Sequence, residues 1–269
     1  MADDLSDIID HYSSDPERER QRLVRHQLEH DLTWRYLDEH LPARGSVLEI
    51  GAATGTYTVE LARRGYTLTS VDLSAALLDE CRKSLVAESL EEQVKLVVAD
   101  ARDLSQITKR EFDAALIMGP LYHLVQEDDR IRALSEVFNR LRQGGIIFST
   151  FISRYGVMGD VMKAIPDWIE DQTGVQFFLA HGRKPDHYPK EGFRGYFATV
   201  SEIAPLHQKL GFETIVVAAV EPAISADDES YNRLQGKQRR YWLDLLYKIS
   251  TDESIVGASR HLLYIGRKR

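Results

Sequence analysis

The first half of the sequence alternates short apolar runs with amphipathic helical patterns, and this alternation restricts the fold more than any other feature. Five apolar runs follow one another: SVLEIG (46–51), TLTSVD (67–72), VKLVVAD (94–100), FDAALIMG (112–119) and GGIIFSTFI (144–152). Near-continuous β-rich runs of this kind, separated by helices, are typical of parallel strands buried on both faces. The sequence therefore predicts a doubly wound α/β fold around a mostly parallel sheet.

Two later runs extend the predicted sheet to seven strands. FETIVVAAV (212–220) follows a helical pattern at 199–210, and RHLLYIGRK (260–268) closes the chain as an expected edge strand. The predicted core has three parts: 46–152, 197–220 and the final strand, 259–269.

Three segments lie outside this core. Residues 1–45 have a helical pattern, with Asp15 suited to cap a helix that starts at Pro16. Two insertions, 153–196 and 221–258, are too long for plain connections. We expect both to form one helical, aromatic cap over the C-terminal edge of the sheet, where open α/β sheets bind ligands. The aromatic residues of this cap are Trp168, Phe177, Phe178, Phe193, Tyr196, Tyr231 and Trp242.

Composition narrows the class of protein. The 269 residues are 43% hydrophobic, yet no apolar run is long enough to span a bilayer, so we expect a soluble protein that does not enter a membrane. The single cysteine, Cys81, excludes an internal disulfide and suits the cytoplasm. The net charge of −8 disfavours nucleic acid as a partner, because that affinity comes from lysine and arginine side chains that neutralise phosphates.

The stretch VLEIGAATG, residues 47–55, predicts a strand that ends in a tight turn with bare backbone close to a ligand. In a dinucleotide-binding turn, glycines occupy places 1, 3 and 6 of the motif. Counted from Gly51, those places hold Gly51, Ala53 and Thr56. A dehydrogenase is therefore the least favoured enzyme class.

The same stretch resembles motif I of the class I S-adenosylmethionine-dependent methyltransferases, whose pattern is E/D-x-G-x-G-x-G. Glu49, Gly51 and Gly55 match this pattern, and Ala53 replaces its central glycine. The turn tolerates the alanine if its φ stays negative. The resemblance implies the family's doubly wound fold and S-adenosylmethionine as the cofactor.

Later motifs extend this resemblance over residues 46–152. Asp72 ends the second strand, where a carboxylate accepts hydrogen bonds from the ribose hydroxyls, although a cap of the next helix is an alternative role. VVADARDL resembles the adenine motif, in which Asp100 accepts from the adenine amino group and the backbone amide that follows meets the ring. FDAALIMGPLYHL and LRQGGIIFSTF resemble the family's fourth strand and its turn into the fifth.

The resemblance also implies a lid and an acceptor side. In that family the N-terminal segment often folds over the cofactor, which would bring Tyr12 or Arg25 to it, although a charged surface helix is the usual meaning of such a run. The expected cofactor contacts are Tyr12, Glu49, Gly51, Ala53, Gly55, Asp72, Leu73, Asp100, Ala101, Arg102, Met118 and Gly119.

Tyr122 and His123 are the candidate catalytic residues. They occupy the place that related ubiquinone-type methyltransferases use beside the methyl-transfer centre. His123 could act as a general base or only orient the acceptor, because displacement at a sulfonium can rest on positioning alone. Both roles stay open.

The sequence therefore predicts methylation of an oxygen, nitrogen or sulfur atom of a small molecule. Two alternatives are methylation of a tRNA base, which the acidic balance disfavours, and a regulatory module that binds the cofactor without turnover. No metal is predicted, since His181 and His187 lack metal-ligand spacing. The acceptor and the oligomeric state stay open.

Overall fold

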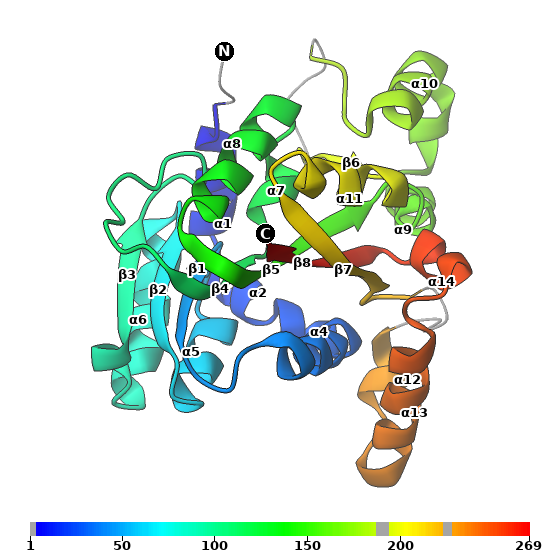
Figure 1. The fold of residues 1–269 in the computed structure, drawn as a ribbon. Helices are drawn as coiled ribbons and strands as arrows, with labels where there is room; N and C mark the ends of the chain where they lie inside the picture. The colour runs from blue at the N-terminus through cyan, green and yellow to red at the C-terminus, as the bar shows by residue number, and fades with distance from the viewer. Residues whose placement is uncertain (1–3, 187–193, 223–227) are drawn as a thin grey trace.

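The computed structural model describes residues 4–186, 194–222 and 228–269, and these residues form a central sheet with helices on both faces (Figure 1). The strands are β1 (Ser46–Ile50), β2 (Thr67–Asp72), β3 (Val94–Val98), β4 (Phe112–Ile117), β5 (Leu141–Ser153), β6 (Phe197–Ala198), β7 (Phe212–Ala219) and β8 (His261–Lys268). Strands β1 to β5 pair in parallel, in the spatial order β3-β2-β1-β4-β5. The doubly wound prediction is confirmed, with an eighth strand, β6, paired to β5.

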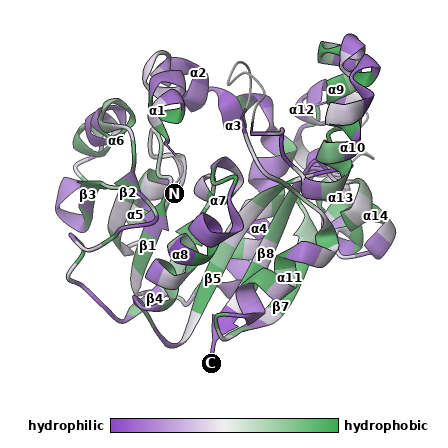
Figure 2. Ribbon diagram, turned by 90° about the horizontal axis from the view of Figure 1, so that it is seen from above, coloured by the Kyte–Doolittle hydropathy of each residue, from purple (hydrophilic) through white to green (hydrophobic). Residues whose placement is uncertain are grey.

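The position expected for the last strand is wrong. β8 lies between β5 and β7 and runs antiparallel to both, so that β7 forms the edge of the sheet. Four consecutive apolar residues of β8, Leu262 to Ile265, are buried because the strand is covered on both faces. Figure 2 shows the resulting hydrophobic band along β5 and β8. Such a continuous apolar run is typical of a central strand.

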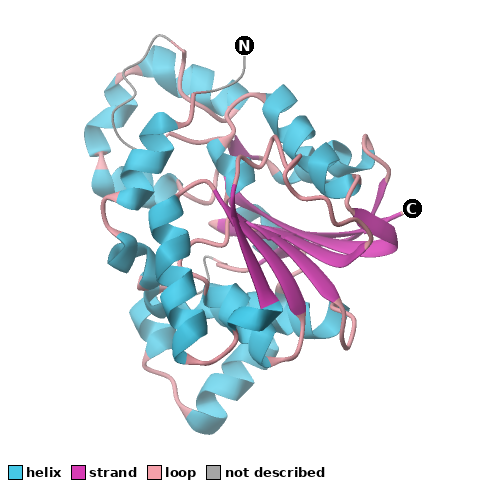
Figure 3. Ribbon diagram, turned by 90° about the vertical axis from the view of Figure 1, so that its left-hand side faces the viewer, coloured by secondary structure: helices cyan, strands magenta, loops and turns pink. Residues whose placement is uncertain are grey.

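Helices cover both faces of the sheet (Figure 3). A hydrophobic cluster lies on each face and holds these helices in place. Leu48 and Ile50 of β1 belong to the cluster under α8 (Glu127–Phe138) and α11 (Val200–Gln208). Val47 belongs to the cluster under α4 (Gln27–His40), α5 (Thr56–Arg63) and α6 (Ala75–Ala87). This alternation follows from the two-residue period of a strand.

The N-terminal segment is broken into shorter helices. They are α1 (Ser6–Ser13), α2 (Pro16–Arg20) and α3 (Arg22–Arg25), ahead of α4. Asp15 caps α2 as expected, since its side chain accepts from the backbone N–H of Arg18 at 3.0 Å. The helical spacing of apolar residues continues across breaks at Gln21 and His26, and spacing alone therefore did not reveal them.

The two insertions are helical, but their described residues do not form one joint cap. The first contains α9 (Met158–Ala164), η2 (Pro166–Glu170) and α10 (Gln172–His181), and the second contains α12 (Asp228–Asn232), α13 (Gly236–Ile249) and α14 (Glu253–Ala258). In the view of Figure 1, α10 lies above the sheet and α13 below it. Among the described residues, no helix combines the length and apolar character needed to cross a bilayer.

Candidate active site

Two adjoining cavities lie where β1, β2 and β4 end, beside α1 and α2. The larger encloses about 690 Å³ of space, which includes its opening to solvent. The predicted residues on its wall are Tyr12, Gly51, Ala53, Asp72, Leu73, Asp100, Ala101, Met118, Gly119, Tyr122 and His123. Three predicted contacts, Glu49, Gly55 and Arg102, are not on this wall.

The turn after β1 uses the left-handed region at three positions. Gly51 has a φ of 83°, Ala53 of 49° and Gly55 of 90°. The condition of a negative φ at Ala53 is therefore not met, and the alanine is held in a conformation that favours glycine. The backbone N–H of Ala53 donates to Oδ2 of Asp72 at 2.8 Å, which fixes the turn against β2.

Gly55 has a packing role. A Cβ at this position would lie 2.5 Å from Sγ of Cys81, so only glycine lets α5 approach α6 this closely. Burial raises the pKa of the Cys81 thiol to about 12. Cys81 therefore stays protonated and acts as an apolar contact.

Asp72 presents its carboxylate at the mouth of the larger cavity. Its Oδ1 accepts from the backbone N–H of Ser74 at 2.8 Å. Ser74 caps α6, because its side chain accepts from the backbone N–H of Leu77. Burial raises the pKa of Asp72. The cap role considered for Asp72 thus belongs to Ser74.

Glu49 lies below the turn. Thr58 and Ser70 donate their hydroxyls to its Oε2 at 2.5 and 3.0 Å. Burial raises the pKa of Glu49 to about 7. Its position supports β1, β2 and α5 from within the core, so any influence on a cofactor passes through the turn.

Asp100 is oriented by Arg102. The Nε of Arg102 lies 3.0 Å from both carboxylate oxygens of Asp100, and Nη1 donates to Asp129 at 2.8 Å. The guanidinium therefore holds Asp100 on the cavity wall without lining the wall itself. The Arg102 side chain thus binds Asp100, and the cofactor contact that the resemblance implied for Arg102 stays a prediction.

Tyr12 and His123 meet across the larger cavity. The hydroxyl of Tyr12 lies 2.8 Å from Nε2 of His123, and α7 (Pro120–His123) carries the histidine directly after β4. Burial lowers the pKa of His123 to about 4 and raises that of Tyr12. Both groups are uncharged at neutral pH. They form a hydrogen-bonded pair between the N-terminal segment and the core.

The smaller cavity, of about 540 Å³, contains charged residues that the sequence did not single out. Glu19 and Arg22 line it, and Arg22 donates from both Nη atoms to Glu29 at 2.9 and 3.0 Å. Arg25, the arginine considered from the sequence, instead donates to the backbone oxygen of Arg18. The charged N-terminal sequence gave no signal that Arg22, and not Arg25, faces the cavity. The helix break at Gln21 decides which of these side chains points inward.

The aromatic residues of the two insertions do not line either cavity in the described residues. Trp168 and Phe178 pack edge to face with ring centroids 5.5 Å apart, and Trp242 is 47% exposed. Phe193 lies outside the described residues. The wall near His123 is instead built by α1 and α7.

Comparison with known proteins points to one family. Residues 47–145 match the methyltransferase domain family. The chain is 28% identical over 149 residues to the glycine/sarcosine N-methyltransferase of Aphanothece halophytica, covering 50% of this chain and 55% of the relative. It is 25% identical over 177 residues to the tRNA 5-carboxymethoxyuridine methyltransferase of Escherichia coli K12, covering 63% and 65%. The chain thus spans less than two thirds of either relative.

A solved structure supports the fold. The chain superposes with a TM-score of 0.60 on the 1,6-didemethyltoxoflavin-N1-methyltransferase of Burkholderia thailandensis, with bound 1,6-didemethyltoxoflavin and S-adenosylhomocysteine. The match covers 98% of this chain and 86% of that chain at 18% identity. At this identity the likeness establishes the fold alone.

Proposed function

Residues 47–145 form a methyltransferase domain of the class I, S-adenosylmethionine-dependent kind, and from this premise we propose that the protein methylates a small-molecule acceptor. One observation carries the proposal. The turn after β1, the carboxylates of Asp72 and Asp100, and the His123 side chain all face one cavity.

The larger cavity suits the adenosine part of the cofactor. Asp72 would accept hydrogen bonds from the ribose hydroxyls, and Asp100 from the adenine amino group. Met118 and Ala101 supply apolar surface beside these acids. Gly51 lets the turn pack against the segment after β4, because a Cβ there would lie 2.7 Å from Cδ of Pro120.

The smaller cavity suits the amino-acid end of the cofactor. Glu19 offers a carboxylate to the ammonium group, and Arg22 offers a guanidinium to the carboxylate. Glu29 holds the guanidinium in place through its two hydrogen bonds. In this arrangement α2 and α3 recognise the cofactor, consistent with the expected lid.

Methyl transfer then depends on positioning. Bound S-adenosylmethionine would supply a methyl group on a sulfonium, which is a good leaving group. The residues around the cavity would hold the acceptor atom in line with that methyl group. His123, with its pKa near 4, is a weak base. The Tyr12–His123 pair therefore orients the acceptor by accepting a hydrogen bond from it. An acceptor that must lose a proton during the reaction transfers that proton to solvent.

Charge favours a small acceptor over tRNA. The chain has a net charge of −8. An excess of acidic side chains disfavours binding of nucleic-acid phosphates. A tRNA acceptor is the second candidate, because one relative is a tRNA methyltransferase.

Two measurements test the proposal. Calorimetry should show saturable binding of S-adenosylhomocysteine and none of NAD. Incubation with deuterium-labelled S-adenosylmethionine should then place the label in a metabolite fraction, and an Asp72→Ala control should reduce it. Label found only in tRNA would show that the acceptor is tRNA and not a small molecule. Cofactor binding with no label in any fraction would favour a regulatory module that binds the cofactor without turnover.

A further inference from the structure

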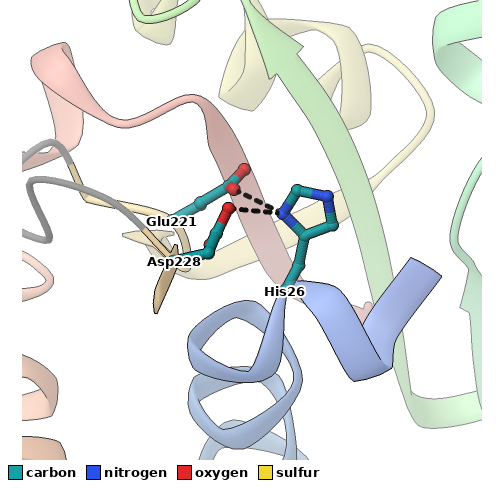
Figure 4. Close-up of side chains that lie close together, drawn as sticks. All are labelled: His26, Glu221 and Asp228. Atoms are coloured by element: carbon teal, nitrogen blue, oxygen red, sulfur yellow. Dashed lines mark hydrogen bonds and ion pairs between the residues drawn. The ribbon is translucent and has the colours of Figure 1, made fainter. Parts of the chain in front are cut away.

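A cluster of charged side chains lies outside the methyl-transfer site, and we propose that it binds one divalent metal ion. The ligand atoms are Nδ1 of His26, a carboxylate oxygen of Glu221 and one of Asp228 (Figure 4). One imidazole and two carboxylates suit Zn²⁺ or Mn²⁺. Sequence spacing predicted no metal, because these ligands are far apart along the chain.

Two of the three spacings between ligand atoms suit a single ion, and all three atoms lie within 4.8 Å of one another. Nδ1 of His26 lies 3.1 Å from Oε1 of Glu221 and 3.1 Å from Oδ2 of Asp228. A tetrahedral ion with bonds of about 2.0–2.1 Å holds its ligand atoms about 3.3 Å apart. A hydrogen on Nδ1 can point well at only one carboxylate at a time, whereas an ion binds all three atoms together.

Three separate elements bring these ligands together. His26 is the break between α3 and α4, Glu221 follows β7, and Asp228 is the first residue of α12. Figure 4 shows the two carboxylates converging on the imidazole. The Glu221 side chain is only 3% exposed, so its carboxylate is poorly hydrated and depends on the groups beside it.

Arg260 is the competitor for the ion. Its Nη2 lies 2.6 Å from Oε1 of Glu221 and 3.6 Å from Oδ2 of Asp228. Its Nη1 lies 3.6 Å from Asp160, whose carboxylate can keep the guanidinium when an ion displaces it. Removal of the guanidinium should therefore tighten metal binding.

Neighbouring groups orient Glu221 and give access to the cluster. Nδ1 of His261 lies 3.0 Å from Oε2 of Glu221 and 3.2 Å from Oε2 of Glu29. His261 therefore holds the Glu221 carboxylate by the oxygen that does not face His26.

A cavity of about 510 Å³, lined in part by His26, Glu221 and Arg260, provides an entry path for the ion. A bound ion would fasten the α3–α4 junction to the end of β7.

The test is titration of the full-length, metal-free protein with Zn²⁺ and with Mn²⁺ by calorimetry. We expect binding of one ion, at least tenfold tighter binding by Arg260→Gln and at least tenfold weaker binding by Asp228→Asn. Glu229→Gln is the matched control, because this exposed carboxylate is the next residue of α12 and pairs only with Arg233 among the described residues. Its affinity should equal that of the unaltered protein.

Folding is checked separately, since Asp228→Asn also removes an ion pair. Each variant is melted without metal, and the ion should raise the melting temperature of the unaltered protein more than that of Asp228→Asn. Equal affinities in Asp228→Asn and the unaltered protein would overturn the proposal. So would an absence of binding to the unaltered protein, even if Arg260→Gln bound the ion, because Arg260 would then be the native cation of this cluster.

Discussion

Asp72 serves the fold and the proposed cofactor site with the same carboxylate. It accepts two backbone N–H groups and still faces the larger cavity. We expect Asp72→Ala to weaken binding of S-adenosylhomocysteine by about 1.5–3 kcal/mol, or about 10–150-fold, the scale for hydrogen bonds to a charged group. Calorimetry measures the change.

Asp103→Ala is the control for this substitution. Asp103 also accepts a backbone N–H, that of Ser105 at 3.0 Å, but it is exposed and does not line the cavity. The affinity of Asp103→Ala for S-adenosylhomocysteine should stay within twofold of that of the unaltered protein. If both variants lost the same affinity, the effect of Asp72→Ala would come from a disturbed loop backbone and not from a lost contact with the cofactor.

Ala53 carries strain that glycine would release. An alanine in the left-handed region destabilises the native state by about 1–2 kcal/mol, and glycine removes this strain. Glycine is also more flexible in the unfolded chain, which cancels about 0.5–1 kcal/mol of that gain in stability. With a φ of 49° at this position, Ala53→Gly should raise the free energy of unfolding by up to about 1 kcal/mol without loss of cofactor affinity.

Chemical denaturation checks this expectation, with Ala87→Gly at the end of α6 as the control. Ala87 is exposed and helical, so glycine there should only destabilise. A loss of stability in Ala53→Gly as large as in Ala87→Gly would mean that the turn is not strained.

The Tyr12 hydroxyl tests the role of the Tyr12–His123 pair. Tyr12→Phe keeps the ring against His123 but removes the 2.8 Å contact. If the pair orients the acceptor, the apparent KM for the acceptor should rise about tenfold, as for one hydrogen bond of about 1.4 kcal/mol, with a smaller change in kcat. Steady-state kinetics with Tyr155→Phe, an exposed tyrosine, supplies the control. A loss confined to kcat would favour a proton-transfer role.

At the scale of the element, α1 is fastened by polar contacts, since none of its residues is fully buried. Arg194 binds Asp7 through Nε and Nη2 at 2.8 and 2.9 Å. Asp7→Asn should loosen α1 and weaken S-adenosylhomocysteine binding about two- to fivefold, the scale of a partly exposed ion pair. Asp10 is exposed on the same helix, so Asp10→Asn should leave both S-adenosylhomocysteine affinity and amide exchange in α1 unchanged. Faster amide exchange at 6–13 in Asp7→Asn alone would accompany the weaker binding.

Parallel strands and their following turns were predictable because their signals are local. Each of β1 to β4 is a short apolar run, and Asp72 and Asp100 follow directly from strand ends. Contacts made across the chain were not predictable. The spatial place of β8 and the inward turn of Arg22 depend on packing partners that no local pattern specifies.

The same reasoning applies to the proposed metal cluster. His26 and Glu221 are nearly two hundred positions apart in sequence, yet their atoms lie 3.1 Å apart. A search for metal-ligand spacing finds only ligands on one helix or loop. Tertiary structure is therefore the first level at which this site becomes visible.

At the scale of the whole molecule, buried histidines make stability depend on pH. His207 of α11 is fully buried; its Nδ1 donates to the backbone oxygen of Ile203 and its Nε2 lies 2.8 Å from Ser149. Burial lowers the pKa of His207 to about 4 from its usual 6.5. Between these values the unfolded chain binds a proton that the native state does not, so native stability falls as the pH falls.

For His207 this loss approaches about 3 kcal/mol between pH 6.5 and 4. His123 acts in the same direction, whereas Glu49, with its pKa raised to about 7, acts in the opposite direction between about pH 4.5 and 7. A comparison of variants separates these contributions. His207→Gln should have a lower free energy of unfolding than the unaltered protein at pH 7. Between pH 7 and pH 5, however, its free energy of unfolding should fall by less than that of the unaltered protein. Denaturant titrations at both pH values, with exposed His181→Gln as the control, measure the slopes. A slope unchanged in His207→Gln would mean that the buried imidazole already binds its proton in the native state.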